Sequence, residues 1–365
     1  MKLSRTTRLA AAFAAGSLAL AACGGSDDAG SSTANAAEGT SLSGTLAGAG
    51  SSAQAAAQEA WVAGFQTANP DVTVNYDPVG SGGGREQFLA GGTDFAGSDA
   101  ALKDDELTKA EQRCGKGGLV ELPLYISPIA VAFNLPGVKK LDLKPDVIAG
   151  IFAQKIKTWD APEIKADNPD AKLPSTKITP VNRADESGTT QNFTEYLAAA
   201  APSVWTKEPS QTWPFPGGEA AQGTSGVVQA IKAAKGAVGY ADASQVGDLG
   251  TAAVGVGSDF VEYSPKAAAA VVAESPRVTG RPEGSLALQV ERDTTKSGNY
   301  PIVLVSYLIG CRTYDDAAKA DLVKGYFSYI ASKDGQEAGA KAAGSAPISD
   351  SLRTDATAQI EKIGA

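Results

Sequence analysis

Short apolar runs alternate with amphipathic segments along most of this chain. Residues 72–76 alternate apolar and polar side chains, which is typical of a strand. Residues 53–68 place Ala57, Trp61 and Phe65 on one helical stripe, which indicates a helix with one buried face. Because this exchange of short strands and helices continues down the chain, the pattern predicts an α/β architecture.

The same pattern predicts a set of strands and helices along the chain. Strands are expected at residues 42–47, 72–76, 95–98, 178–182 and 237–240. Helices are expected at residues 53–68, 85–89, 104–113, 145–152, 191–201, 226–234 and 317–332. In the last of these, Leu322, Tyr326, Phe327 and Ile330 form the core face.

Two long, nearly all-apolar segments stand out at residues 119–133 and 300–309. They could be a pair of strands that cross between two lobes, or two ordinary buried strands, and the pattern alone favours neither. Roughly 320 residues follow the N-terminal segment, which is more than one core usually serves, so two lobes are expected.

The N-terminus has the pattern of a processing signal. Lys2, Arg5 and Arg8 precede an apolar stretch at residues 9–20 that is too short to span a bilayer. Leu-Ala-Ala-Cys then ends at Cys23 and resembles the lipobox of bacterial lipoproteins, in which the cysteine becomes the lipidated N-terminus; a secretory signal with an incidental cysteine is the alternative. We therefore expect a signal peptide at 1–22 and a Gly- and Ser-rich flexible tether at 23–43.

Charge and composition exclude several classes of function. Removing Lys2, Arg5 and Arg8 with the signal changes the formal charge from −9 to −12, which argues against nucleic acid or anionic lipid as a partner. The chain contains no histidine, which excludes Ser-His-Asp and Cys-His catalysis and the commonest zinc ligand sets. We expect no catalytic residues, no metal and no cofactor.

With Cys23 assigned to lipid, Cys114 and Cys311 remain. In an oxidising compartment an even pair can form a disulfide, and two unpaired buried thiols are the alternative.

Three segments have the composition of an anion site at a helix start. Residues 183–190 combine Arg183, Asp185, small residues and hydroxyls between a strand-like run and a helix. The unpaired N–H groups of a first helical turn attract an anion, and Arg183 could grip two of its oxygens while Asp185 holds the guanidinium. Residues 48–52 and 80–84 are similar Gly- and Ser-rich connections, and neither matches a Walker loop or a dinucleotide fingerprint. Singly, each could be an ordinary cap or glycine turn; together they favour an oxyanion site.

Asp99 is the unusual member of this group, because a carboxylate would repel a fully ionised anion. It would accept a hydrogen bond from a protonated oxyanion such as hydrogen phosphate and reject sulfate. The alternative is a helix-capping aspartate.

These motifs together resemble the PstS family, the phosphate-binding proteins of bacterial phosphate ABC importers. The resemblance rests on four segments: Gly-Ala-Gly at 48–50, Gly-Ser-Gly-Gly at 80–83, Asp-Phe-Ala-Gly-Ser-Asp-Ala at 94–100 and Arg-Ala-Asp-x-Ser-Gly-Thr at 183–189. It implies a type II periplasmic-binding-protein fold, an α/β fold of two lobes joined by two crossover strands. Lobe I would comprise 44–127 plus 300–365, and lobe II 128–299.

The resemblance also implies a set of phosphate-binding residues. These would be Ser52, Ala53, Ser81, Asp99, Arg183, Ser187, Gly188 and Thr189, with Asp185 holding Arg183. On this mapping Cys114 and Cys311 both lie near the crossover side of lobe I, which favours a bridge. The chain departs from the family at residues 51–54, where Ser-Ser-Ala-Gln replaces Ala-Thr-Phe-Pro, and at Glu186, where glycine is common. Because an inward-facing Glu186 would place a negative charge near the anion and lower affinity, we expect it to face solvent.

The sequence thus predicts a monomeric, lipid-anchored phosphate receptor on the outer face of the bacterial cell membrane. It would close its lobes around inorganic phosphate and deliver it to membrane permease subunits of an ABC importer. A receptor for another oxyanion, such as sulfate, molybdate or an organic phosphate, is the alternative. A secreted phosphatase that uses Ser187 or Thr189 as a nucleophile is a third hypothesis.

Overall fold

The computed structural model describes residues 42–365, so the predicted signal peptide, Cys23 and nearly all of the predicted tether lie outside the described residues. The described strands are β1 Gly44–Gly50, β2 Val72–Asp77, β3 Phe95–Ser98, β4 Leu119–Phe133, β5 Lys140–Leu143, β6 Thr179–Arg183, β7 Glu219–Ala221, β8 Ala237–Asp242, β9 Gly250–Val256, β10 Asp259–Val261 and β11 Val303–Cys311. The helices are α1 Ala55–Ala68, α2 Ser81–Leu89, α3 Asp104–Cys114, α4 Pro145–Phe152, α5 Pro162–Asp167, α6 Gly188–Ala200, α7 Gly223–Ala233, α8 Pro265–Glu274, α9 Ala317–Ala331, α10 Lys333–Ala343 and α11 Asp350–Ile360.

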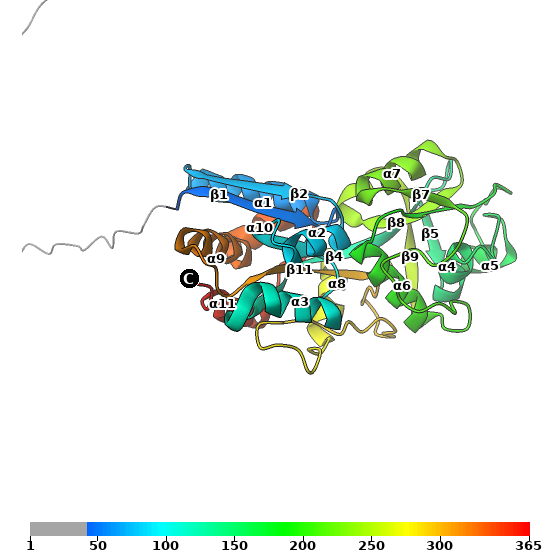
Figure 1. Ribbon diagram of the computed structural model, residues 1–365. Coiled ribbons are helices and arrows are strands. Elements are labelled where there is room, and N and C mark those ends of the chain that lie inside the picture. Colours follow the sequence, from blue (N-terminus) through cyan, green and yellow to red (C-terminus); the bar gives the residue numbers. More distant parts are fainter. Residues whose placement is uncertain (1–41) are drawn as a thin grey trace, which may run out of the picture. The chain divides into compact units, whose positions relative to one another are not determined.

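The strands form a curled sheet in the order β2-β1-β3-β11-β4-β8-β6-β7, with β9 joining β4, β5 and β10. One lobe gathers around β1, β2 and β3, which pair in parallel, and carries α1, α2, α3, α9, α10 and α11 (Figure 1). The other gathers around β6, β7 and β8 and carries α4 to α7. We call these lobe I and lobe II. The expected two-lobed α/β fold is confirmed.

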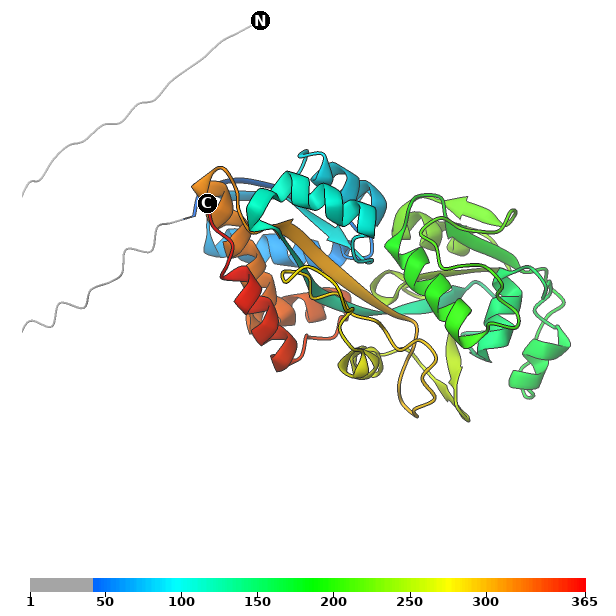
Figure 2. The ribbon, with the colours of Figure 1, turned by 60° about the horizontal axis from the view of Figure 1, so that its bottom comes forward.

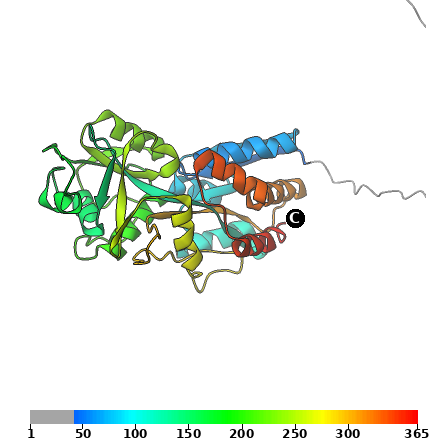
Figure 3. The same cartoon turned by 180° about the vertical axis from the view of Figure 1, so that it is seen from behind.

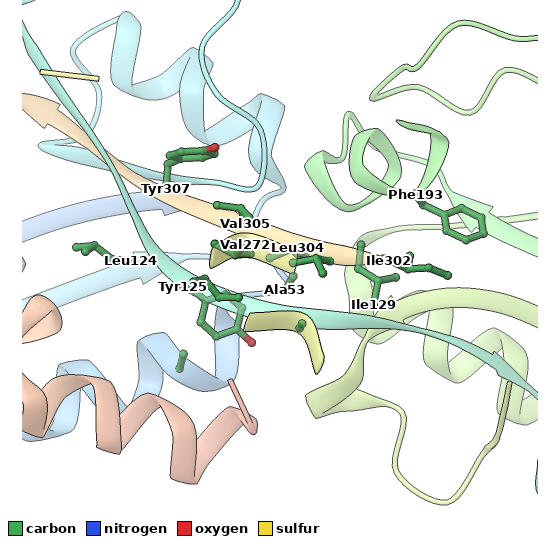
Figure 4. Close-up of a cluster of buried hydrophobic side chains, with 14 of the residues drawn as sticks. Ala53, Leu124, Tyr125, Ile129, Phe193, Val272, Ile302, Leu304, Val305 and Tyr307 are labelled. Carbon is green, nitrogen blue, oxygen red and sulfur yellow. The ribbon is translucent and has the colours of Figure 1, made fainter. Parts of the chain in front are cut away.

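Strands β4 and β11 connect the lobes and pair with each other in antiparallel fashion (Figure 2). The first part of β4 pairs with β11, and its last five residues pair with β8 in lobe II. β4 is buried along its whole length, as its apolar sequence requires. Figure 4 shows Ile129 and Ile302 between the lobes, with Tyr125 and Leu304 further along the same pair of strands. The two long apolar runs are therefore strands that cross between the lobes, which was one of the two interpretations of the sequence.

The β4–β11 pairing contains one irregularity. The register shifts between Ser306 and Tyr307, which pair with Tyr125 and Pro123, so Leu124 has no partner on β11. Proline has no N–H to donate to a ladder, so an extra residue beside Pro123 costs the sheet little. The consequence is local, because Ser306 lies at this bulge and its side chain reaches the site described below.

The predicted helices and strands have the expected types, but several boundaries were wrong, and the sequence analysis did not predict β5, β7, β9, β10, α5, α8, α10 and α11. α2 begins at Ser81 and not at Arg85, α6 at Gly188 and not at Gln191, and α7 at Gly223 rather than Gly226. Glycine and hydroxyl residues have poor helix propensity, so the pattern places them in loops, although free N–H groups make them suitable for a first turn. The segment 80–84 is therefore the opening turn of α2 and not a flexible loop.

A disulfide joins Cys114, at the end of α3, to Cys311, at the end of β11. The two Cα atoms are 5.2 Å apart, and both residues are buried. The bridge joins the segment before β4 to the end of β11. Of the two alternatives for these cysteines, the structure therefore contains the disulfide. Seen from behind, the C-terminus lies at the end of lobe I remote from lobe II (Figure 3).

Tyr125 on β4 lies against an acidic group of β8. Its hydroxyl donates to Oδ2 of Asp242 at 3.1 Å, while Ser244 donates both its N–H and its hydroxyl to Oδ1. Burial raises the pKa of Asp242 to about 6, against the hydrogen bonds from Ser244 and Tyr125, which lower it. The charged form of Asp242 is therefore unfavourable in the folded protein.

We expect Asp242→Asn to stabilise the fold at pH 8, by at most about 3 kcal/mol. A raised pKa means that the stability contributed by Asp242 is full below about pH 4 and is lost as the pH rises through about 6. The gain of the variant should therefore shrink between pH 8 and pH 4.5, as measured by denaturant unfolding. The exposed Asp248→Asn is the matched control, and an Asp242→Asn protein no more stable than wild type at pH 8 would contradict the expectation.

Candidate functional site

Three strands, two from the parallel ladder of lobe I and one from that of lobe II, have their carboxyl ends between the lobes. β1 ends before Ser51 and Ser52, β3 ends before Asp99, and β6 ends at Arg183. In open α/β sheets ligands bind outside the carboxyl ends of strands, where helices begin. The predicted site residues of both lobes therefore lie together between the lobes.

Asp99 is one of the residues through which the two lobes contact each other. Its side chain accepts from Ser306 Oγ at 2.6 Å and from Thr189 Oγ1, in lobe II, at 3.0 Å. Its backbone N–H donates to Ser81 Oγ, and its carbonyl accepts from Asn192 Nδ2. Asp99 is only 3% exposed. Burial raises its pKa above the ordinary value, and the hydrogen bonds from Ser306 and Thr189 and the charge of Arg183 lower it in part.

Two helix N-termini meet at Asp99 from opposite lobes. α2 begins at Ser81 and α6 begins at Gly188, capped by Ser187, whose Oγ accepts from Thr190 N–H. A Cβ atom on Gly188 would lie 2.7 Å from both the Asp99 Cβ and the Ser81 Oγ, so glycine is required for this approach. Within residues 42–365 the backbone N–H groups of Ser81, Gly188 and Thr189 make no hydrogen bond. They are available to an anion, and the positive ends of two helix dipoles add to the attraction.

Arg183 is held in a fork by Asp185. Nε donates to Oδ1 at 2.8 Å and Nη2 donates to Oδ2. A guanidinium carries five N–H donors, so three remain, two on Nη1 and one on Nη2. Nη1 has no hydrogen-bond partner in the described part of the chain, which leaves it free to bind an oxyanion.

Asp185 also accepts from the N–H of Gly223, the first residue of α7. Burial by itself would raise the pKa of this carboxyl, but the hydrogen bond and charge of Arg183, with the Gly223 N–H, bring the pKa below its ordinary value. Asp185 is thus ionised and fixes both the guanidinium and a third helix start.

Ser52 and Ala53 lie in the connection between β1 and α1. Ser52 Oγ is 3.0 Å from the hydroxyl of Thr224 in α7, and it also accepts from the N–H of Thr224. Gln245 donates to the Ser52 carbonyl from lobe II. The Ala53 N–H donates to Ser51 Oγ at 3.1 Å. The hydroxyl of Ser52 is therefore engaged with lobe II, and this wall of the site is tied down although it lacks an aromatic residue.

Glu186 is exposed, as expected from its sequence position. Its carbonyl accepts from the Gly82 N–H, and a Cβ atom on Gly82 would lie 2.5 Å from the Glu186 Cβ. The residue therefore lies across the start of α2 with its side chain at the rim, where water can screen its charge.

The sequence interpretation missed several residues of the site. Thr224 and Gly223 belong to a Gly-Thr-Ser-Gly start of α7 that has the same composition as the three recognised segments, so that signal was present. Ser306, Asn192 and Gln245 carry no local signal, because only the tertiary fold brings them to Asp99 and Ser52. A cavity of about 440 Å³ also borders Asp99 on the side of Asn192 and Arg292.

The arrangement suits capture of a small oxyanion that carries a proton. Donors come from both lobes, and one acceptor, Asp99, lies among them. No group of three or more His, Cys, Asp or Glu side chains in residues 42–365 could hold a metal ion. No helix among the described residues is long and apolar enough to cross a membrane.

Comparisons with known proteins show the family and the fold of this chain. A family model described as "PBP superfamily domain" matches residues 35–334. The phosphate-binding protein PstS3 of Mycobacterium bovis is 35% identical over 89% of this chain and 90% of its own length. PstS2 of the same organism is 34% identical over 100% of both chains. The subatomic-resolution structure of a high-affinity periplasmic phosphate-binding protein with bound phosphate superposes with a TM-score of 0.71 at 24% identity. The match covers 86% of this chain and 93% of that one and shows a shared fold.

We expect Asp185→Ala to lower the free energy of unfolding at pH 7 by about 3 kcal/mol, because it leaves the buried Arg183 without its partner. Since the pKa of Asp185 is lowered, its contribution is present at neutral pH and is lost as the pH falls below about 4, so the difference from wild type should narrow in acid. Denaturant unfolding at pH 7 and pH 3.5 measures both effects. The exposed Asp170→Ala is the control, and equal losses at the two pH values would refute the assignment.

Proposed function

This chain belongs to the PstS family of phosphate-binding proteins, and we propose that it captures inorganic phosphate between its two lobes and delivers it to an ABC importer. One observation carries the proposal. The Asp99 carboxylate lies among donors, with helix starts from both lobes and the free Nη1 of Arg183 around it. Only an anion that brings its own proton satisfies both the donors and this acceptor.

Each predicted residue has a role that its contacts allow. Ser81, Gly188 and Thr189 supply free N–H groups, and the hydroxyl of Ser81, which within residues 42–365 only accepts from the Asp99 N–H, adds a donor. The single hydroxyl hydrogen of Thr189 is donated to Asp99 and orients that carboxylate. The three remaining N–H donors of Arg183 reach two phosphate oxygens, while Asp185 keeps the guanidinium in place. Ser52 and Ala53 form the wall of the site between β1 and α1, where the Ser52 hydroxyl contacts Thr224 of lobe II and the Ala53 N–H donates to Ser51. Ser187 acts mainly by capping α6, since its hydroxyl accepts from Thr190.

Binding and release, without chemistry, is the activity that these groups support. Ser187 and Thr189 would be the nucleophiles of a phosphatase, but Ser187 Oγ caps a helix and Thr189 Oγ1 donates to Asp99. The chain has no histidine to serve as a base for either. Among other oxyanions, sulfate is disfavoured because it brings no proton to Asp99 at neutral pH.

The setting of the receptor follows from its N-terminal sequence. We propose that residues 1–22 are removed, that Cys23 is lipidated, and that residues 23–43 tether a monomer to the outer face of the membrane, where permease subunits accept phosphate. The lobes would comprise 44–127 plus 300–365, and 128–299. Within the second range, Arg281 and Ser285 themselves donate to Glu121 of β4, so this segment extends back towards lobe I.

Titration calorimetry with phosphate, arsenate and sulfate tests the function. We expect tight binding of phosphate, binding of arsenate because it also carries a proton, and much weaker binding of sulfate. A parallel assay with a phosphate monoester should show no turnover. Measurable turnover, or a preference for sulfate, would contradict the proposal.

The role of Asp99 is tested by Asp99→Asn. An amide can donate to an oxygen without a proton, so the ratio of phosphate to sulfate affinity should fall by roughly 100-fold or more. Calorimetry measures the ratio, with the exposed Asp71→Asn as the matched control. An unchanged ratio would remove Asp99 from the discrimination.

A further inference from the structure

Arg85 is a fully buried cation that contacts no predicted phosphate-binding side chain. It lies on α2 one turn after Ser81, and its exposed fraction is 0%. Nε donates to both oxygens of Glu106 at 3.0 and 3.1 Å, and Nη1 donates to Ser98 Oγ at 3.0 Å. These partners all belong to lobe I, and Ser98 directly precedes Asp99.

The fourth contact of Arg85 comes from the other lobe. Nη2 donates to Oε1 of Gln211 at 2.8 Å. Gln211 lies in the connection between α6 and β7, is 5% exposed, and also accepts from the N–H of Ser187 through its backbone carbonyl at 3.0 Å. Gln211 therefore connects the cap of α6 to a cation of α2.

We propose that the Arg85–Gln211 hydrogen bond is a latch that forms when the lobes close and holds the start of α6 in position against Asp99. The inference rests on the proposed phosphate function. The two side chains come from different lobes, so separating the lobes exposes Nη2 and Oε1 to water. In the closed form they are shielded and must satisfy each other. The latch consequently stabilises the closed form without touching the anion.

The choice of a neutral acceptor fits the electrostatics. Glu106 already balances the charge of Arg85, and a second carboxylate would add negative charge beside an anion site. The amide oxygen of Gln211 completes the guanidinium's contacts with no further charge. Gln211 is thus a positioning residue whose effect should fall on release of phosphate and not on the choice between anions.

The test is Gln211→Met, which keeps the length of the side chain and removes the acceptor. Stopped-flow measurement should show phosphate release about tenfold faster, because the closed form then buries an unpaired charged donor. The association rate should stay within twofold, and the ratio of phosphate to sulfate affinity should not change. The exposed Gln112→Met on α3 is the matched control.

Two further measurements separate a latch from a merely structural role. The melting temperature of the ligand-free protein should be unchanged in Gln211→Met, and a double-mutant cycle with Arg85→Lys should show coupling in the release rate. A release rate within twofold of the wild-type rate overturns the latch. So does a loss of stability in Gln211→Met that is as large without ligand as with phosphate. If Arg85→Lys does not fold, the Gln211→Met result alone decides. Failure of the wild-type protein to bind phosphate in the same titration would instead overturn the proposed function.

Discussion

The site depends on one unfavourable placement, a carboxylate buried where donors for an anion converge. Asp99 is removed from water, and hydrogen bonds replace the lost hydration. The hydroxyls of Ser306 and Thr189 donate to its carboxylate, and its backbone N–H donates to the hydroxyl of Ser81. Burying a charge is tolerated only when it is hydrogen-bonded, so these neighbours are fixed by the same requirement. The bulge lies at Ser306, which donates to Asp99, and the glycine at the start of α6 leaves room for the donors of that helix to approach.

Closure of the lobes is distributed over several modest polar contacts. Hydrogen bonds join the lobes in four residue pairs: Ser52 with Thr224, Gly82 with Glu186, Asp99 with Thr189, and Arg85 with Gln211. Each hydrogen bond contributes little net free energy because water replaces it when the lobes separate. A two-lobed protein built this way can be biased towards the closed form by a small ligand that contacts both lobes. The continuous strand β4, shared by both lobes, limits how they can move.

The sequence was sufficient for elements with a clear period and insufficient for those that begin with glycine. The long helix α9 was predicted because its apolar residues repeat at helical spacing, and β4 because it is a long, nearly all-apolar run. The starts of α2, α6 and α7 were missed because their residues gain stability from ligands or neighbours and not from intrinsic propensity. Ser306 and Gln211 could not be found in one sequence, since their partners lie 207 and 126 residues away.

Gly80 and Gly188, where the lobes contact each other, allow the two backbones to approach closely because they have no side chain. A methyl group on Gly188 would collide with Asp99 and Ser81, and one on Gly80 would lie 2.4 Å from Asp185 Oδ2. The distance between the lobes is therefore set by the absence of two side chains rather than by the groups that hold the anion. A designer of a phosphate sensor could widen that spacing one carbon at a time, which would move the anion-binding groups of one lobe away from those of the other and shift the concentration range of the response.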